Sequence, residues 1–232
     1  MKKTLLLLVI SVTFFACNDS KKDEKTISSE GKTESKPLEN ATTAEKIAYA
    51  NGYDNWKNVS EINFTFNVDR GEQHFERSWT WKPNENMVKM ISQKDTVTYN
   101  RSKVDSTTQK ADAAFINDKF WLLAPFNLVW DTGTTFSEKK NVIAPISKDT
   151  LNQLTVVYGN DGGYTPGDAY DFFYDENHKI KEWNFRKGND SVPTMTTTWE
   201  KYENHKGLEI ATTHKDSTGG FKLYFSNISV KN

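Results

Sequence analysis

The stretch Ile62-Asn63-Phe64-Thr65-Phe66-Asn67-Val68 alternates strictly between apolar and polar side chains. Such a period of two predicts a β-strand with one face buried in a core. Residues 69–72, Asp-Arg-Gly-Glu, supply a turn. After the turn the alternation resumes in a second strand, whose core face carries Phe75, Arg77, Trp79 and Trp81. The two runs therefore predict an antiparallel hairpin.

Further alternating runs occur along most of the chain. Short strands are expected at 87–92 and 96–101, and longer ones at 154–158, 170–174, 180–186, 195–202, 208–214 and 221–230. The segment 133–140 is predicted to be a loop. About ten strands with few helices predict a mainly β fold, in which a curved antiparallel sheet wraps short helices.

Helical signals occur at two places. Thr42 and Glu45 have the spacing of a capping box, which predicts the start of a helix. Gly52 can adopt the left-handed conformation that ends this helix. Between 106 and 130 the apolar period lengthens, which predicts two short helices at 108–117 and 118–123, ended by Pro125. The run 120–126, Phe-Trp-Leu-Leu-Ala-Pro-Phe, is too apolar to remain in water. It must either fill the inside of the sheet or cover a cavity.

The N-terminus has the form of a targeting signal. Two lysines precede a mostly apolar run too short to span a bilayer, and Ala16 stands directly before Cys17, the one cysteine of the chain. This is the pattern of a bacterial lipoprotein signal, in which the cysteine is acylated and the peptide before it is removed. The alternative is an ordinary secretory signal followed by a chance cysteine.

The composition after Cys17 predicts how the chain is organised. Residues 18–40 contain many charged and hydroxyl side chains and no aromatic residue, so we expect a disordered tether. The expected parts are a signal peptide at 1–16, the lipidated Cys17 with its tether at 17–40, and a single domain at 41–232. Such a protein would be held by its lipid in the bacterial envelope, at the outer membrane, facing the periplasm or the cell surface.

Charge and cysteine content exclude several classes. A net charge of -1 with 26% charged residues leaves no basic excess, so a nucleic-acid partner is not expected. Aromatic residues make up 13% of the chain, which favours sheet over helical bundle. A single cysteine allows no disulfide within the chain. We expect a monomer that contacts the membrane through its N-terminal lipid.

No catalytic motif stands out. The four histidines are scattered, and no two have the i, i+4 spacing that favours metal binding on a helix. Asp168, Asp171 and Asp175 lack the spacing of a calcium loop. The Gly-X-Ser-X-Gly elbow and the lysine of a phosphate loop are both missing. The sequence predicts no enzyme, no cofactor and no metal.

Arg77 is unusual because alternation places it on the core face between Phe75 and Trp79. A buried guanidinium is costly unless it is paired, although it can stack on aromatic rings. One interpretation is a cation in the hollow that meets a lipid head group or carboxylate. The other is an edge position from which Arg77 reaches water, or a salt bridge to a neighbour such as Glu182. If Arg77 serves a ligand, its replacement by Met should leave folding intact.

Several stretches resemble the Lol-type carrier domains. Ala50-Asn51-Gly52, Trp56 and the strand 62–68 look like the opening of these domains, and the insert 115–126 is similar to a branch of envelope lipoproteins from Gram-negative bacteria. Residues 162–170 and 199–202 match as well. The resemblance implies an incompletely closed half-barrel with a hydrophobic hollow that binds acyl chains or another apolar ligand. Cys17 fits the LolB-like receptors better than a soluble carrier such as LolA.

Two functional hypotheses follow. The first is a lipid-anchored protein that holds a lipid, a lipoprotein acyl chain or another apolar ligand in its hollow. The second is a structural or interaction lipoprotein whose hollow is filled by residues 120–126, and an envelope hydrolase is disfavoured by the absent motifs. The ligand-binding candidates are Phe64, Phe66, Phe75, Arg77, Trp79, Trp81, Trp121, Leu122 and Phe126.

Overall fold

The computed structural model describes residues 40–159 and 165–232. The predictions for the signal peptide, for Cys17 and for the tether lie outside these residues. All described helices and strands lie between Thr43 and Lys231, and so does the hydrophobic core. A chain that starts at residue 18 therefore keeps every one of them. In the described part of the chain, no helix combines the length and the apolar character needed to cross a membrane.

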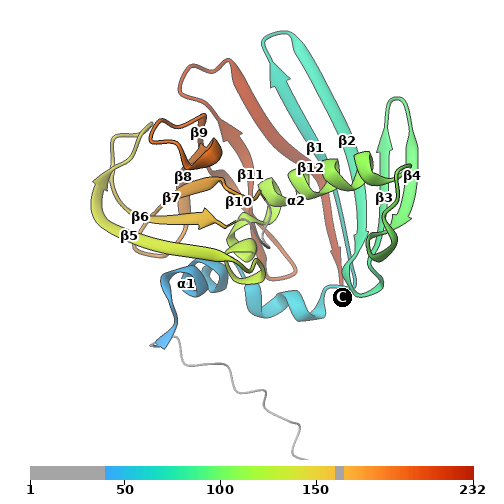
Figure 1. The fold of residues 1–232 in the computed structure, drawn as a ribbon, viewed down its shortest axis with the longest axis horizontal. Helices are drawn as coiled ribbons and strands as arrows, with labels where there is room; N and C mark the ends of the chain where they lie inside the picture. Colours follow the sequence, from blue (N-terminus) through green and yellow to red (C-terminus); the bar gives the residue numbers. More distant parts are fainter. Residues whose placement is uncertain (1–39, 160–164) are drawn as a thin grey trace, which may run out of the picture. The chain divides into compact units, whose positions relative to one another are not determined.

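The larger sheet is built around the predicted hairpin. Its seven antiparallel strands follow the order β10-β11-β12-β1-β2-β3-β4 (Figure 1). Within it, Phe64 of β1 lies opposite Trp79 of β2. The strand bounds are β1 Glu61–Arg70, β2 Gln73–Lys82, β3 Met87–Ser92, β4 Thr96–Asn100, β10 Glu200–His205, β11 Leu208–Lys215 and β12 Phe221–Lys231.

The smaller sheet contains five antiparallel strands in chain order. Their bounds are β5 Thr134–Ile143, β6 Thr150–Tyr158, β7 Ala169–Tyr174, β8 Ile180–Arg186 and β9 Met195–Thr198. The prediction of a loop at 133–140 is wrong, because β5 covers most of that segment. β5 is an edge strand that is exposed along almost its whole length, so it lacks the buried face that produces apolar alternation.

The two sheets meet at Trp199, which alone separates β9 from β10. The strand predicted at 195–202 is therefore broken into two. The backbone N–H of Trp199 donates to the carbonyl of Lys181 at 2.6 Å, and its buried ring packs on Trp183 and His214, with ring centroids 5.5 and 4.5 Å away. The predicted fold class is confirmed: a mainly β chain forms curved antiparallel sheets that do not close into a barrel and that enclose helices.

The helix α2, Gln109–Trp130, runs between the two sheets (Figure 1). On one side the ring of Phe115 lies 5.4 Å from the rings of Trp79 and Trp81. On the other side the ring of Phe120 lies 4.8 Å from that of Tyr170. Because α2 contacts both sheets through aromatic side chains, it forms the centre of the core.

The predicted break between 117 and 118 and the predicted stop at Pro125 are wrong, since α2 continues through the proline to Trp130; the predicted end at 123 coincides with a kink in the helix. A proline lacks a backbone N–H, and its ring clashes with the carbonyl four residues earlier in a regular helix. Here the backbone leaves helical geometry at Leu123, with φ -128 and ψ 26. Pro125 thereby falls in the first turn after the kink, where proline is tolerated.

The predicted capping box of helix α1, Thr43–Ala50, is confirmed. The Thr42 hydroxyl accepts from the Glu45 N–H at 3.2 Å, and the Glu45 carboxylate accepts from the Thr42 N–H at 2.8 Å. Gly52 ends the helix in the left-handed region with φ 86, as predicted. It also touches the β10–β11 turn so closely that an added Cβ would lie 1.9 Å from the carbonyl oxygen of Gly207.

Candidate functional site

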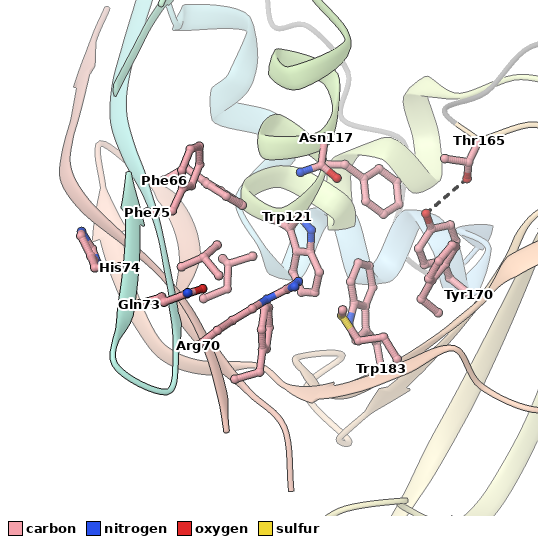
Figure 2. A pocket seen from close by; sticks show the side chains of 16 residues that line it. Phe66, Arg70, Gln73, His74, Phe75, Asn117, Trp121, Thr165, Tyr170 and Trp183 are labelled. Atoms are coloured by element: carbon pink, nitrogen blue, oxygen red, sulfur yellow. Dashed lines mark hydrogen bonds between the residues drawn. The ribbon is translucent and has the colours of Figure 1, made fainter. Parts of the chain in front are cut away.

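A cavity of about 770 Å³ opens beside the middle of α2, between the ends of strands from both sheets (Figure 2). Its polar lining consists of Arg70, Gln73, His74, Asn117 and Thr165. Its apolar lining consists of Phe66, Val68, Phe75, Phe120, Trp121, Tyr170, Trp183, Phe185, Met195, Phe221 and Leu223.

The inner wall is a set of interlocked aromatic rings from α2, β7 and β8. The Trp121 and Trp183 rings meet edge to face with centroids 4.5 Å apart, and the Tyr170 ring lies 5.1 Å from those of Trp183 and Phe185. The hydroxyls of Tyr170 and Thr165 are hydrogen-bonded at 3.2 Å (Figure 2). Burial raises the pKa of Tyr170, so its hydroxyl stays neutral at ordinary pH.

The opposite wall is formed by neighbouring strands of the larger sheet. Val68 of β1 lies across from Leu223 of β12 on one side and from Phe75 of β2 on the other. Their side chains share the face that alternation assigns to the core. Phe75 is nevertheless 46% exposed, because it stands close to the turn of the hairpin. The wall therefore runs from the buried core to an apolar rim in contact with solvent.

His74 borders the cavity without entering it. In Figure 2 its side chain points away from the other lining residues, towards the outer face of the hairpin. Its Nδ1 lies 2.7 Å from the carboxylate of Asp69, and this hydrogen bond raises the pKa of His74. His74 is therefore bound on the outer face of the hairpin. The described lining inside the cavity consists of apolar rings and a few neutral polar groups, with Arg70 at the mouth.

Arg77 does not line the cavity. The sequence suggested an edge residue that reaches water or a partner of Glu182. Arg77 is neither of these. Its guanidinium binds the wholly buried carboxylate of Asp118 on α2, with Nη2 2.7 Å from Oδ1. The carboxylate of Glu182 instead accepts backbone N–H groups of Ile146 and Ser147 at 2.7 and 2.8 Å. A salt bridge was one of the predicted roles of Arg77, but its partner is in the helix.

Two further donors complete the environment of Asp118. Trp79 Nε1 donates to Oδ2 at 2.8 Å, and Asn117 Nδ2 donates to Oδ1 at 3.0 Å. Burial raises the pKa of Asp118, and the hydrogen bonds from Arg77 act in the opposite direction. The Arg77 guanidinium also lies over the ring of Phe75, 5.0 Å from its centroid. This arrangement ties β2 to α2 just behind the cavity.

The structure separates the predicted ligand-binding residues into two groups. Phe66, Phe75 and Trp121 line the cavity. The remaining side chains belong to the core or to the Asp118 ion pair, and they are Phe64, Arg77, Trp79, Trp81, Leu122 and Phe126. The run 120–126 serves both predicted purposes, since its first two residues face the cavity and those that follow are buried in the core.

The sequence reasoning missed most of the cavity lining. Tyr170, Trp183 and Phe221 were placed on strands, but alternation cannot show that rings from distant strands face a common space. The sequence pattern predicts a turn at Arg70, whereas β1 extends to include it. The signal that could have found Arg70 is its spacing of two from Val68, which continues the apolar face of the strand.

A buried polar network surrounds the kink of α2. Lys119 Nζ donates to Asn127 Oδ1 at 3.3 Å, so this bond joins the two segments of the helix. Asn127 in turn donates to Asp131, which also accepts from the hydroxyl of Tyr158 at 2.9 Å. Burial lowers the pKa of Lys119 to about 8. The network gives hydrogen-bond partners to buried polar side chains on both sides of the kink.

Within residues 40–159 and 165–232, no three His, Cys, Asp or Glu side chains gather in a way that could hold a metal ion. The described site therefore offers aromatic surface, a few neutral polar groups and one guanidinium. Such a set can bind and orient an apolar or amphiphilic molecule.

Comparison of the sequence with family models and with curated proteins gives no match. Solved structures of the Lol type are similar to this chain. A LolA superfamily protein from Nitrosomonas europaea has 13% identity and a TM-score of 0.45, covering 83% of this chain and 95% of its own. A putative outer membrane lipoprotein-sorting protein domain from Vibrio parahaemolyticus has 13% identity and a TM-score of 0.45, and the match covers 82% of this chain and 94% of that domain. A DUF1329 family protein from Desulfovibrio piger has 9% identity and a TM-score of 0.46, and the match covers 82% of this chain and 92% of that protein.

Proposed function

We propose that this protein binds the apolar part of a lipid, or an acyl chain, in the cavity beside α2. The observation that carries the proposal is the cavity itself, about 770 Å³ in volume and lined mainly by aromatic and aliphatic side chains. Ligand pockets in proteins are typically of this size and are lined in the same way. Each methylene group moved from water into such a site contributes about 0.8 kcal/mol.

The exposed apolar rim also supports a ligand. Phe75 is 46% exposed at the mouth, next to an opening into the aromatic interior. A protein whose hollow served only as core would gain stability by filling this volume with its own side chains. The alternative of a structural or interaction lipoprotein is supported by the burial of Leu122, Leu123 and Phe126, which fill the space next to the cavity.

We further propose that the chain is anchored in the bacterial envelope by a lipid on Cys17. The support is the order of the N-terminal sequence, in which lysines, an apolar run and Ala16 precede the cysteine. Labelled palmitate added to a Gram-negative expression host should be incorporated into the wild-type chain and not into Cys17→Ala. Equal labelling of both chains would reject the anchor at this position.

Binding can be tested on the chain that starts at residue 18, with the neutral apolar dye N-phenyl-1-naphthylamine as the probe. We expect a saturable rise in its fluorescence. Val68→Trp should abolish most of this rise, because Val68 lines the cavity and the larger ring would occupy it. Ile91→Trp is the matched control, since Ile91 is 46% exposed on β3 and lies outside the cavity lining.

Native mass spectrometry of the same chain supplies an independent measurement. Lipid that co-purifies with the wild type and is lost in Val68→Trp supports the proposal. A folded chain that carries no lipid and shows no saturable dye binding would contradict it and would favour the structural alternative.

A further inference from the structure

We propose that Arg70 makes the cavity selective for amphiphiles with an anionic head group, a carboxylate or a phosphate, whose tail lies against the aromatic wall. The inference rests on the proposed function, because it names the class of apolar ligand that the cavity takes. The sequence suggested a cation in the hollow at Arg77, and the inference places it instead at Arg70, beside the turn of the same hairpin.

The position of Arg70 directs its side chain to the cavity. It is the last residue of β1, opposite Gln73 of β2 and Phe221 of β12. Since side chains alternate along a strand, Arg70 shares the face of Val68, which also lines the cavity. Its guanidinium carbon lies 5.4 Å from the centroid of the Phe221 ring. Figure 2 shows the side chain pointing inward from the strand end.

Arg70 differs from the other arginines because it forms no ion pair with any carboxylate in the described part of the chain. The other three arginines of the chain, Arg77, Arg101 and Arg186, each form an ion pair with an aspartate. Among the described residues, Arg70 has a contact with the Phe221 ring and no ion pair. Its donors are therefore available to a ligand, whereas those of the other arginines are engaged within the fold.

The charge of the lining agrees with this role. Of the lining residues that the structure describes, Arg70 alone carries a permanent positive charge, and none is an aspartate or glutamate. The planar guanidinium matches carboxylate and phosphate groups with two parallel N–H donors. Its place at the mouth lets a head group remain partly in water while the tail enters the cavity. An amine or a neutral head group would gain no comparable interaction.

A matched pair of fluorescent probes tests the inference on the chain that starts at residue 18. The probes are cis-parinaric acid, which is anionic, and its methyl ester, which has the same tail without the charge. At low salt we expect the acid to bind about tenfold more tightly than the ester. Arg70→Gln should weaken binding of the acid to the level of the ester and leave binding of the ester unchanged. Arg70→Lys should retain part of the preference.

Lys222→Gln is the control for a general loss of positive charge. Lys222 is adjacent to Phe221 in sequence, but its ammonium group lies 4.2 Å from the centroid of the Tyr224 ring and outside the cavity lining. Its replacement should change neither affinity. Displacement of bound parinaric acid then identifies the head group: dodecanoate or monododecyl phosphate should displace it, and the stronger of the two names the preferred anion.

The outcomes separate this inference from the proposed function. Equal binding of acid and ester by the wild type, an unchanged affinity for the acid in Arg70→Gln, or equally strong displacement by dodecanol would overturn the role of Arg70 while the cavity remains a binding site. If neither probe binds to a folded chain, the proposed function fails and the preference for anions fails with it.

Discussion

Arg77 on β2 and Asp118 on α2 form an ion pair in the interior, with Nη2 of the arginine 2.7 Å from Oδ1 of the aspartate. The aspartate side chain is wholly buried and that of the arginine is 20% exposed. The pair spans 41 positions of sequence and connects the larger sheet to the central helix. Removing one partner of a buried pair leaves an uncompensated charge, which is far more costly than removing both.

Arg77→Met should therefore lower the free energy of unfolding by about 3 kcal/mol. This expectation reverses the one drawn from the sequence for an arginine that serves a ligand. The double variant Arg77→Met/Asp118→Leu should be more stable than Arg77→Met alone, because it leaves no unpaired carboxylate. Urea unfolding of the four chains of this cycle measures the coupling.

Arg101 provides the matched control for the cycle. Its Nε lies 2.8 Å from Oδ1 of Asp112, which is on α2 like Asp118. The Arg101 side chain is 30% exposed and that of Asp112 is 14% exposed. Arg101→Met should cost about 1 kcal/mol or less, as is usual for ion pairs near the surface. Equal losses for the two arginines would contradict the importance given to burial of Asp118.

The stability of the fold should fall between pH 7.5 and 5.5 because of His214. This side chain is completely buried, its Nδ1–H donates to the carbonyl of Thr198 at 3.2 Å, and burial lowers its pKa to about 3 despite the nearby Glu200. The unfolded chain binds a proton there below about pH 6.5, whereas the folded chain does not. The folded state therefore loses about 1.4 kcal/mol over this interval.

The His214→Asn variant should lack this part of the pH dependence, as measured by urea unfolding at both pH values. His74 contributes equally to both chains, so its effect cancels in the comparison. NMR should show a neutral His214 ring at pH 5, while His74, whose pKa is raised by Asp69, titrates above its ordinary value. A His214 ring that titrates near pH 6.5 would refute the prediction.

Lys119 should make stability rise with pH in the alkaline range, in the same direction as the effect of His214 at lower pH. Burial lowers its pKa to about 8, compared with about 10.4 in an unfolded chain. Between these values the unfolded state binds more protons, so stability rises with pH. Relative to Lys119→Met, the wild type should gain about 1 kcal/mol from pH 7 to pH 9. Parallel stability curves for the two chains would show that Lys119 is not buried in its charged form.

Gly52→Ala should destabilise the fold by at least about 2 kcal/mol, because strain at positive φ adds to a collision with the carbonyl of Gly207. The added Cβ would lie 1.9 Å from that oxygen. Gly71→Ala is the control: its φ is +57, but nothing lies within 4 Å of the added atom, so about 1 kcal/mol is expected. Similar midpoints of thermal unfolding for the two variants would argue against the close contact.

The elements that could be predicted from the sequence are those fixed by neighbouring residues. The hairpin around Gly71 follows from a period of two, and the start of α1 follows from Thr42 and Glu45. The edge strand β5 could not be found in this way, since both of its faces meet solvent along most of its length. A proline within a helical pattern predicts the end of the helix. The local sequence around Pro125 does not reveal the kink at Leu123 that accommodates it, because that kink depends on the surrounding core.

The site was harder to predict, because a cavity is the space that distant side chains leave open. Alternation correctly turned Phe66 and Phe75 inward, but it also selected Trp79 and Trp81, which are packed against α2. The pattern cannot distinguish a ring that fills the core from one that borders open space. The partner of Arg77 likewise depends on how the helix lies in the sheet, which local spacing does not contain.

The double use of α2 has a consequence for how such proteins diverge. Phe120 and Trp121 face the cavity, while Leu122 and Leu123, the next two residues, are buried in the core. A substitution that reshapes the cavity from the helix side would disturb folding at the same time. Residues at strand ends, such as Phe221 and Met195, border the cavity and are only partly buried. We therefore expect related chains to change the shape and polarity of this cavity by substitution at the strand ends, while the helix is inherited almost unchanged.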